Sequence, residues 1–297
     1  ILEVLSGVGL NDQPLCILAK TYKGAGVSFL QDQDNWHGKP LNKEEAARAI
    51  AELQPSAKSA RGVAIPAPSA LPAPNNTAPT SYPALSYKLG DLMATREAYG
   101  VALVRIGETD QRVVAMDGDT KNSTYAEKFF KKFPERATEC FIAEQNLVAV
   151  AVGFGTRGKV PFASTFATFF TRAFDQIRVA GISMANLKLV GSHVGVSIGE
   201  DGPSQMALED LAMMRAVIGS VVLYPSDAVS TEKLLEVMAQ HRGIFFLRTS
   251  RPKTPVIYKN DEQFPIGGAK IVRQNAGDKV TVVGAGVTLH EALKAAD

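Results

Sequence analysis

The stretch that decides the fold is VPFASTFATFFTRAFDQIRVAGISMANLKLV, at residues 160–190. It opens and closes with short apolar runs, Val160–Ala163 and Leu187–Val190, which are typical of buried strands. Between them, Phe166–Ile182 is expected to form a helix, because four phenylalanines recur there at helical spacing and predict a core-facing stripe. A strand, a helix and a strand in this order predict two parallel strands joined by a right-handed crossover.

The same alternation continues on both sides of this stretch. Further strands are expected at Arg112–Met116, Val221–Tyr224 and Ile244–Leu247. Further helices are expected from about Ala143, from about Met206 to Val217, and around Leu234, Val237 and Met238. The alternation predicts a doubly wound, three-layer α/β domain with a parallel sheet, whose ligands lie beyond the carboxyl ends of the strands.

Six prolines between Pro66 and Pro83 predict an extended linker and a domain boundary. Before the linker, a strand is expected at Leu15–Lys20 and a helix at Lys43–Leu53. After the α/β domain, Lys279–Val283 and Leu289–Ala295 predict a strand and a helix that begin another domain. The expected organisation is a first domain at 1–60, a linker at 61–86, the α/β domain at 87–260 and the start of a third domain at 261–297.

Composition excludes several classes of partner. A net charge of +2, with acidic and basic residues interspersed, gives no basic stripe for a nucleic-acid backbone. The longest uncharged apolar run, Leu147–Gly155, is far shorter than the ~20 residues of a spanning helix. No secretory signal is visible at the start, and two cysteines without a Cys-x-x-Cys pair are typical of a reducing compartment. We therefore expect a cytoplasmic protein without nucleic-acid or membrane partners.

Glu144 is the only ionisable residue between Phe141 and Gly155. A carboxyl group in such surroundings is expected to lie against a core, where it stays protonated or is held by a partner. Either state would let it share a hydrogen bond with a ring nitrogen of a ligand. The alternative is a glutamate in the first turn of a helix, favoured only by the helix dipole.

The residues around Glu144 point to a known family. AEQN (143–146) is followed by STFATFFTRAFDQIR (164–178) and by GSHVGVSIGEDGPSQ (191–205). Matching segments elsewhere are AKTYKG (19–24), WHGKP (36–40), ATREAYG (94–100), DGDTKNST (117–124), RTSRP (248–252) and GAGVTLHEAL (284–293). Together these segments resemble the transketolases, in order and over nearly the whole chain.

The resemblance implies transfer of a two-carbon ketol unit from a ketose phosphate to an aldose phosphate in the pentose phosphate pathway, with thiamine diphosphate and magnesium as cofactors. It implies that Glu144 bonds N1′ of the aminopyrimidine ring and that Phe166 and Phe169 wall the pocket in which this ring stacks. Arg172 stands in the same wall, where yeast, plant and most bacterial members have a tyrosine, so the chain looks more like the animal branch. Asp119 and Lys23 are the other implied cofactor contacts, and Asp119 is also implied to lie at the subunit interface.

The resemblance also implies the substrate-binding residues. His193, Asp201 and Gln205 lie on the glycine-rich loop and are implied to contact the sugar, with Gln205 in place of a second histidine of the yeast-like branch. A glycine-rich loop with a solvated histidine is the alternative interpretation. The phosphate-end residues are implied to be Arg96, Ser123 and Arg251, and His37, beside Lys39, is implied to touch the donor and the reacting carbon.

In transketolases a Gly-Asp-Gly…Asn segment holds the magnesium ion, and the resemblance places this segment before Ile1. The metal ligands are therefore expected outside this chain, which looks like the middle of a transketolase. Residues 1–60 would end the diphosphate-binding domain, 87–260 would form the pyrimidine-binding domain, and 261–297 would begin the carboxyl-terminal domain. The implied assembly is a homodimer with shared sites, and a non-catalytic interaction module is an alternative.

Another alternative is a magnesium-dependent phosphatase. Asp117 and Asp119 follow an apolar strand in the pattern Asp-x-Asp-x-Thr, as do the nucleophile and acid of haloacid-dehalogenase phosphatases. That chemistry also needs a later lysine and an acidic pair directly after a strand to hold magnesium. Glu200 and Asp201 follow Val-Ser-Ile-Gly instead, so the sequence does not complete the set.

Overall fold

The computed structural model describes residues 16–53, 78–79 and 81–297. The chain divides into two compact units, residues 1–70 and 71–297, which we describe separately. In the first unit, α2 (Lys43–Leu53) has the predicted bounds. Glu52 of this helix accepts hydrogen bonds from the backbone and hydroxyl of Ser28, at 2.6 and 2.9 Å. This pairing ties α2 to the loop that precedes it.

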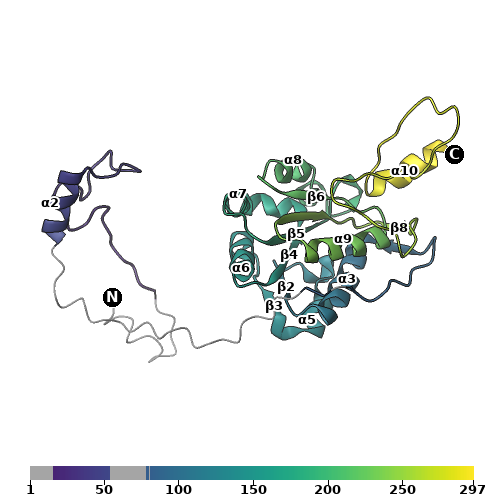
Figure 1. The fold of residues 1–297 in the computed structure, drawn as a ribbon, viewed down its shortest axis with the longest axis horizontal. Coiled ribbons are helices and arrows are strands. Elements are labelled where there is room, and N and C mark those ends of the chain that lie inside the picture. The colour runs from purple at the N-terminus through teal and green to yellow at the C-terminus, as the bar shows by residue number, and fades with distance from the viewer. Residues whose placement is uncertain (1–15, 54–77, 80) are drawn as a thin grey trace. The chain divides into compact units, whose positions relative to one another are not determined.

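The second unit is built on a six-stranded parallel sheet, which confirms the predicted doubly wound fold (Figure 1). The strand order is β3-β2-β4-β5-β7-β6. The strands are β2 (Val113–Asp117), β3 (Ala137–Glu139), β4 (Val160–Phe166), β5 (Leu187–Ser192), β6 (Val221–Leu223) and β7 (Ile244–Arg248). Because all the neighbouring pairs are parallel, the carboxyl ends of the six strands lie at one edge of the sheet.

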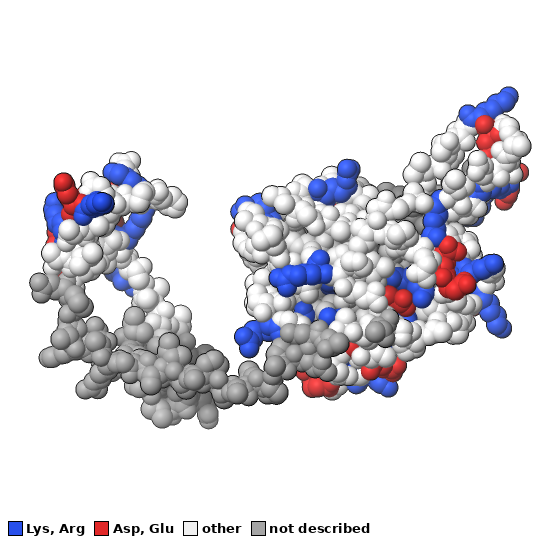
Figure 2. Space-filling view, in the orientation of Figure 1, with Lys and Arg blue, Asp and Glu red and all other residues white. Residues whose placement is uncertain are grey.

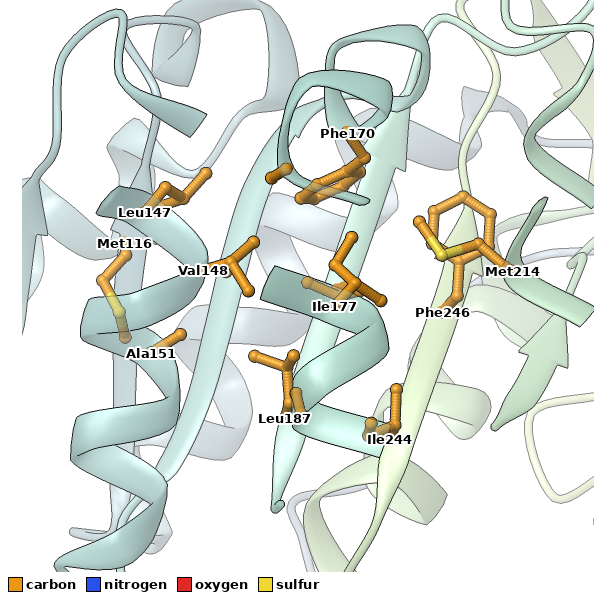
Figure 3. Packing of buried hydrophobic residues seen from close by; sticks show 14 of the residues in the cluster. Met116, Leu147, Val148, Ala151, Phe170, Ile177, Leu187, Met214, Ile244 and Phe246 are labelled. Carbon is orange, nitrogen blue, oxygen red and sulfur yellow. The ribbon is translucent and has the colours of Figure 1, made fainter. Parts of the chain in front are cut away.

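Side chains that alternate along the strands supply two hydrophobic cores, one on each face of the sheet. Val114 and Met116 of β2 contribute to one core, and Val113 and Ala115 to the other. The first core is closed by α6 (Glu144–Thr156), α7 (Phe174–Ile182) and α8 (Asp210–Arg215), as Figure 3 shows. The second is closed by α3 (Thr95–Thr109), α5 (Glu127–Lys132) and α9 (Ala228–Gln240). The sheet is therefore the middle of three layers.

Short elements complete this unit. A two-stranded antiparallel sheet pairs β1 (Leu92–Ala94) with β8 (Lys253–Pro255). The remaining helices are α4 (Lys121–Thr124), α10 (Val287–Ala296) and the 3₁₀ turns at Pro134–Arg136, Ala167–Ala173, Val196–Ile198 and Pro203–Gln205. In α10, the ring of the buried His290 lies 2.6 Å from the carbonyl oxygen of Ser226. This contact holds α10 against the loop before α9.

Within the described residues, the expected helix at Phe166–Ile182 is wrong in its first half. Phe166 ends β4, and the chain then forms the 3₁₀ turn of residues 167–173 before α7 begins at Phe174. The phenylalanines consequently do not share one α-helical face. Phe170 is fully buried in the core, whereas Phe166 and Phe169 are only partly buried.

Two expected strands are absent from the described part of the chain. Residues 16–20 form no strand, and Ile17 and Leu18 are exposed; Leu15 lies outside the described residues. Lys279–Val283 is also not a strand, and its valines at 282 and 283 are exposed. An apolar run becomes a strand only when a neighbour pairs with its backbone, and neither segment has such a neighbour among the described residues. The helix expected at Met206–Val217 is also shorter, since α8 covers only Asp210–Arg215.

Most of the proline-rich segment lies outside the described residues, so the domain boundaries at 60, 86 and 260 stay predictions. Across residues 16–53, 78–79 and 81–297, none of the helices combines the length and apolarity required to span a bilayer. On the face shown in Figure 2, the charged side chains of residues 81–297 are scattered over uncharged surface rather than gathered in a stripe.

Candidate functional site

The loops at the carboxyl edge of the parallel sheet carry most of the predicted site residues. Three of these loops leave their strands through a non-glycine residue with positive φ: Asp119 after β2 (65°), Phe141 after β3 (55°) and His193 after β5 (60°). Left-handed backbone is uncommon for such residues and is concentrated at functional sites. The edge of the sheet where ligands are expected is thus also where the backbone is strained.

Glu144 is the first residue of α6 and is buried. Its Oε2 lies 2.8 Å from Nη1 of Arg172, which also donates to the carbonyl oxygen of Ile142 at 3.1 Å. The carboxylate thus lies at a helix amino terminus and is also held by a partner, so the helix dipole is not its sole stabilisation. Its other oxygen, Oε1, has no hydrogen-bond partner among the described residues and is not one of the fully enclosed unpartnered atoms.

Three rings form a continuous stack beside this carboxylate's helix. Phe166 stacks on Phe169, with ring centroids 5.1 Å apart and planes inclined by 13°. Its other face meets the imidazole of His193 at 3.8 Å and 18°. The stack depends on the turn at residues 167–173, because that turn brings Phe169 back over the end of β4. Both faces of Phe166 are therefore covered, so a flat ring bound here would stack on the outer face of Phe169 or of His193.

His193 is a buried imidazole in a cationic environment. Burial lowers its pKa to about 4, and Arg96 and Arg251 act in the same direction while Asp201 opposes them. Its Nδ1 lies 2.8 Å from the hydroxyl of Ser192, and its Nε2 lies 3.6 Å from Oδ2 of Asp201. The ring is therefore neutral at pH 7 and can exchange a hydrogen bond with a polar ligand.

Arg251 and Asp201 are linked directly. Nη1 of Arg251 donates to Oδ2 of Asp201 at 3.0 Å and to the carbonyl oxygen of Ile198 at 2.7 Å, and Nη2 pairs with Glu200. These bonds fix the glycine-rich loop next to the end of β7. Gln205 lies on the same loop but is hydrogen-bonded to its neighbour Ser204.

Arg96, in the first turn of α3, is held above the ring of Tyr125 at 5.4 Å and donates to the carbonyl oxygen of Ser123 at 3.1 Å. Burial lowers the pKa of this arginine. Within the described structure its Nε and the hydroxyl of Ser250 are enclosed without a hydrogen-bond partner. The backbone N–H of Arg96 lies 3.5 Å from the carbonyl oxygen of Ser250, so the two residues are neighbours.

Asp117 has a structural position. Its carboxylate is fully buried and accepts hydrogen bonds from the backbone and hydroxyl of Thr120, at 2.6 and 3.0 Å, and from the hydroxyl of Thr124 at 2.8 Å. It thereby fixes the α4 turn, and it does not face a ligand as a phosphatase nucleophile must. Asp119 is exposed, and its backbone N–H donates to Glu139, whose carboxylate also accepts from the backbone of Phe141.

Lys23, His37 and Lys39 lie in the other unit. Each is exposed, and Lys39 lies over the ring of Trp36 at 4.2 Å. Across the described ranges, no three His, Cys, Asp or Glu side chains are grouped closely enough to hold a metal ion. The expected location of the magnesium ligands outside this chain stays a prediction.

Three contributors were missed in the sequence. Ser250 stands inside RTSRP beside Arg251, Tyr125 follows Ser123 and Thr124, and Ile142 contributes only its carbonyl oxygen. Position after a buried strand was the available signal for Ser250. No side-chain signal marks Ile142, because its contribution comes from the backbone.

Several known proteins resemble this chain over most of its length. The family described as transketolase, pyrimidine binding domain, matches residues 91–256. Human transketolase is 55% identical over 287 residues, covering 96% of this chain and 46% of the human protein. Mouse transketolase-like protein 2 is 55% identical over 293 residues, covering 97% of this chain and 46% of the mouse protein.

A solved structure titled "Split gene transketolase, inactive beta4 tetramer" is 40% identical, with a TM-score of 0.62 over 69% of this chain and 65% of that one. The chain spans about half the length of the curated relatives that it matches.

Proposed function

Because the chain belongs to the transketolase family, we propose that it forms the part of a thiamine diphosphate-dependent transketolase that binds the aminopyrimidine ring and the sugar phosphate. The observation that carries this proposal is the Glu144 carboxylate, which is buried, held at one oxygen by Arg172 and unpartnered at the other within the described structure. A buried acceptor of this kind is suited to a ring N–H of a bound heterocycle.

The residues present fit the cofactor. Glu144 offers the acceptor, and Phe169, backed by Phe166, offers an aromatic face for a flat ring. When bound, thiamine diphosphate supplies the electron sink for carbanion chemistry. Glu144 would hold a proton at the ring nitrogen, and the apolar wall would exclude water from it.

The sugar phosphate would meet the other half of the site. Arg96 and Arg251 offer guanidinium groups for the phosphate, next to Ser123 and the unpartnered hydroxyl of Ser250. His193 is neutral at pH 7 and would orient a sugar hydroxyl by hydrogen bonding rather than by charge.

Asp201 would accept from a further sugar hydroxyl, and Gln205 would contribute once it releases Ser204. By the resemblance, His37 would act at the reacting carbon and Lys23 at the cofactor. Asp119 would contact the cofactor at the subunit boundary, and magnesium ligands would come from outside this chain. Together these groups would carry out ketol transfer between sugar phosphates in the pentose phosphate pathway.

We further propose that the complete protein is a cytoplasmic homodimer whose sites are shared between subunits. Phe141 and Ile142, just before Glu144, are exposed by 67% and 71%. Exposed apolar side chains beside a functional carboxylate support an association surface there. The related split-gene chain is titled inactive, which supports the expectation that a chain of this extent needs a complement for activity.

The test is Glu144→Gln in the complete protein. The amide keeps the shape of the side chain but cannot hold the same proton, so ketol transfer should fall by roughly 10²–10⁴-fold with the fold unchanged. Glu209→Gln, at an exposed carboxylate before α8, is the matched control and should leave activity unchanged. Activity close to wild type in Glu144→Gln, with thiamine diphosphate in excess, would contradict the proposal.

A further inference from the structure

Arg172 is the one cation that contacts the Glu144 carboxylate in the described structure. It lies in the turn of residues 167–173, and its side chain is 55% exposed whereas that of Glu144 is 6% exposed. A buried carboxylate paired with a largely exposed arginine needs an explanation, because an exposed ion pair is worth little by itself. The effect of the contact therefore lies in how it holds the buried carboxylate of Glu144.

The geometry of the contact is selective. One nitrogen, Nη1, donates both to Oε2 of Glu144 at 2.8 Å and to the carbonyl oxygen of Ile142 at 3.1 Å. The backbone of Ile142 anchors the guanidinium, and the guanidinium in turn anchors one carboxylate oxygen. A carboxylate held at a single oxygen cannot rotate freely, so Oε1 keeps a fixed direction and remains available as an acceptor.

We infer that Arg172 is a positioning residue: it pins Oε2 of Glu144 so that Oε1 is presented, already oriented, to the ring N–H of the bound heterocycle. This inference rests on the proposed function. It differs from the role implied by resemblance, in which Arg172 belongs to the wall around the ring, because here Arg172 acts on the ligand only through Glu144. Pre-orientation of a buried acceptor raises affinity by removing the freedom that binding would otherwise have to remove.

Substitutions at Arg172 separate these two roles. Arg172→Gln removes the charge, and Arg172→Lys keeps it. A lysine can satisfy this contact because a single nitrogen makes both hydrogen bonds and an ammonium group carries three donors. Arg178→Gln is the matched control, since Arg178 is also 55% exposed but pairs with the surface residue Asp175 at 2.7 Å.

The experiment measures the dissociation constant of thiamine diphosphate by calorimetry in the complete protein with magnesium. Arg172→Gln should weaken binding by about tenfold to a hundredfold, the loss expected for a charge-assisted hydrogen bond at a buried group. Arg172→Lys should stay within about threefold of wild type, because it retains the ammonium donor. Arg178→Gln should bind like wild type.

The decisive arm combines Arg172→Gln with Glu144→Gln. If Arg172 acts only through Glu144, its loss should not weaken binding further in the Glu144→Gln background. Equal weakening in both backgrounds would mean that Arg172 contacts the ligand directly, and would overturn the inference. Unchanged affinity in Arg172→Gln would also overturn it.

A second measurement needs no cofactor. The guanidinium ¹⁵N resonances of Arg172 should report slow rotation in the wild-type protein and faster rotation in Glu144→Gln, and equal rates would overturn the inference. The two proposals fail in different ways. A wild-type protein that does not bind thiamine diphosphate refutes the proposed function and the inference with it, whereas binding that depends on Glu144 but not on Arg172 refutes the inference alone.

Discussion

Replacing Lys188 with methionine tests the energetics of the sheet on which the site is built. Lys188 stands in β5 and is fully buried. Its ammonium group donates to the carbonyl oxygens of His241 at 2.6 Å and Gly243 at 3.1 Å, and lies 4.3 Å from the centre of the Phe245 ring. Methionine has a similar length and no charge, so the substitution removes the ion while filling its space.

Burial lowers the pKa of Lys188 from 10.5 to about 7, and repulsion from Arg242 and Arg112 adds to the shift. Each pKa unit corresponds to about 1.4 kcal/mol, so the buried charge destabilises the folded state by at most about 5 kcal/mol. Removing the two hydrogen bonds loses about 0.5–1.5 kcal/mol each. Below pH 7, Lys188→Met should therefore be more stable than wild type, by about 2 kcal/mol or more.

The sign reverses at high pH. Between pH 7 and 10.5 the unfolded lysine binds a proton that the folded one has lost, so wild-type stability rises with pH by up to about 1.4 kcal/mol per unit. The variant lacks this rise. Near pH 10.5 the charge of Lys188 no longer destabilises the wild-type protein. The remaining difference is that the variant lacks the two hydrogen bonds, so the variant should be the less stable protein. The two curves of unfolding free energy against pH should therefore cross between pH 7 and 10.5.

The assay is urea unfolding followed by circular dichroism from pH 6 to pH 10.5, with wild type and variant compared at each pH. Lys253→Met, at an exposed lysine of β8, is the control, and its difference from wild type should not vary with pH. A difference for Lys188→Met that is independent of pH, or a loss of stability at pH 6, would refute the reasoning.

Four further outcomes are expected. Burial raises the pKa of Asp117 to about 7, so the folded protein keeps a proton that the unfolded chain releases above about pH 4. The contribution of Asp117 to wild-type stability should therefore fall between pH 4 and 7, and Asp117→Asn should lack this fall. The same variant and the wild type should both fail to hydrolyse an aryl phosphate with magnesium, and an activity lost on substitution would favour the phosphatase alternative. The 297-residue chain by itself should show no clear thermal shift with thiamine diphosphate and magnesium, although tight binding at 100 times the dissociation constant would stabilise it by ~2.7 kcal/mol. Sedimentation of the complete protein at low micromolar concentration should show a homodimer, and a stable active monomer would contradict the shared site.

The parallel sheet was predictable because its strands are mostly apolar. Leu187–Val190 and Ile244–Leu247 fall inside β5 and β7, since strands covered on both faces bury nearly every side chain, and Lys188 is the charged exception in β5. β3 was missed because Ala137–Glu139 is short and contains no apolar run. Lys279–Val283 has such a run but no strand beside it in the described structure, and pairing cannot be read from one segment alone.

The sequence predicted the burial of Glu144 but not its contacts. The buried carboxylate at Glu144 followed from the absence of other charges around it. Its pairing with Arg172 did not, because it depends on the 3₁₀ turn that replaces the expected helix and changes where residue 172 points. The stack of Phe166 on His193 joins two strands that are neighbours only in the folded sheet.

The left-handed backbone at Asp119, Phe141 and His193 lowers the stability of the fold but fixes the direction in which each loop leaves its strand. Glycine would adopt these angles without strain, so a chain selected only for thermal stability should accumulate glycine at the two exposed positions, Asp119 and Phe141. Such a chain would also lose the Cβ atoms that aim the side chains and would let each loop sample other exits from its strand. If larger residues persist at these positions during evolution, selection acts on the side chains that the loops present, even though glycine would make the protein more stable.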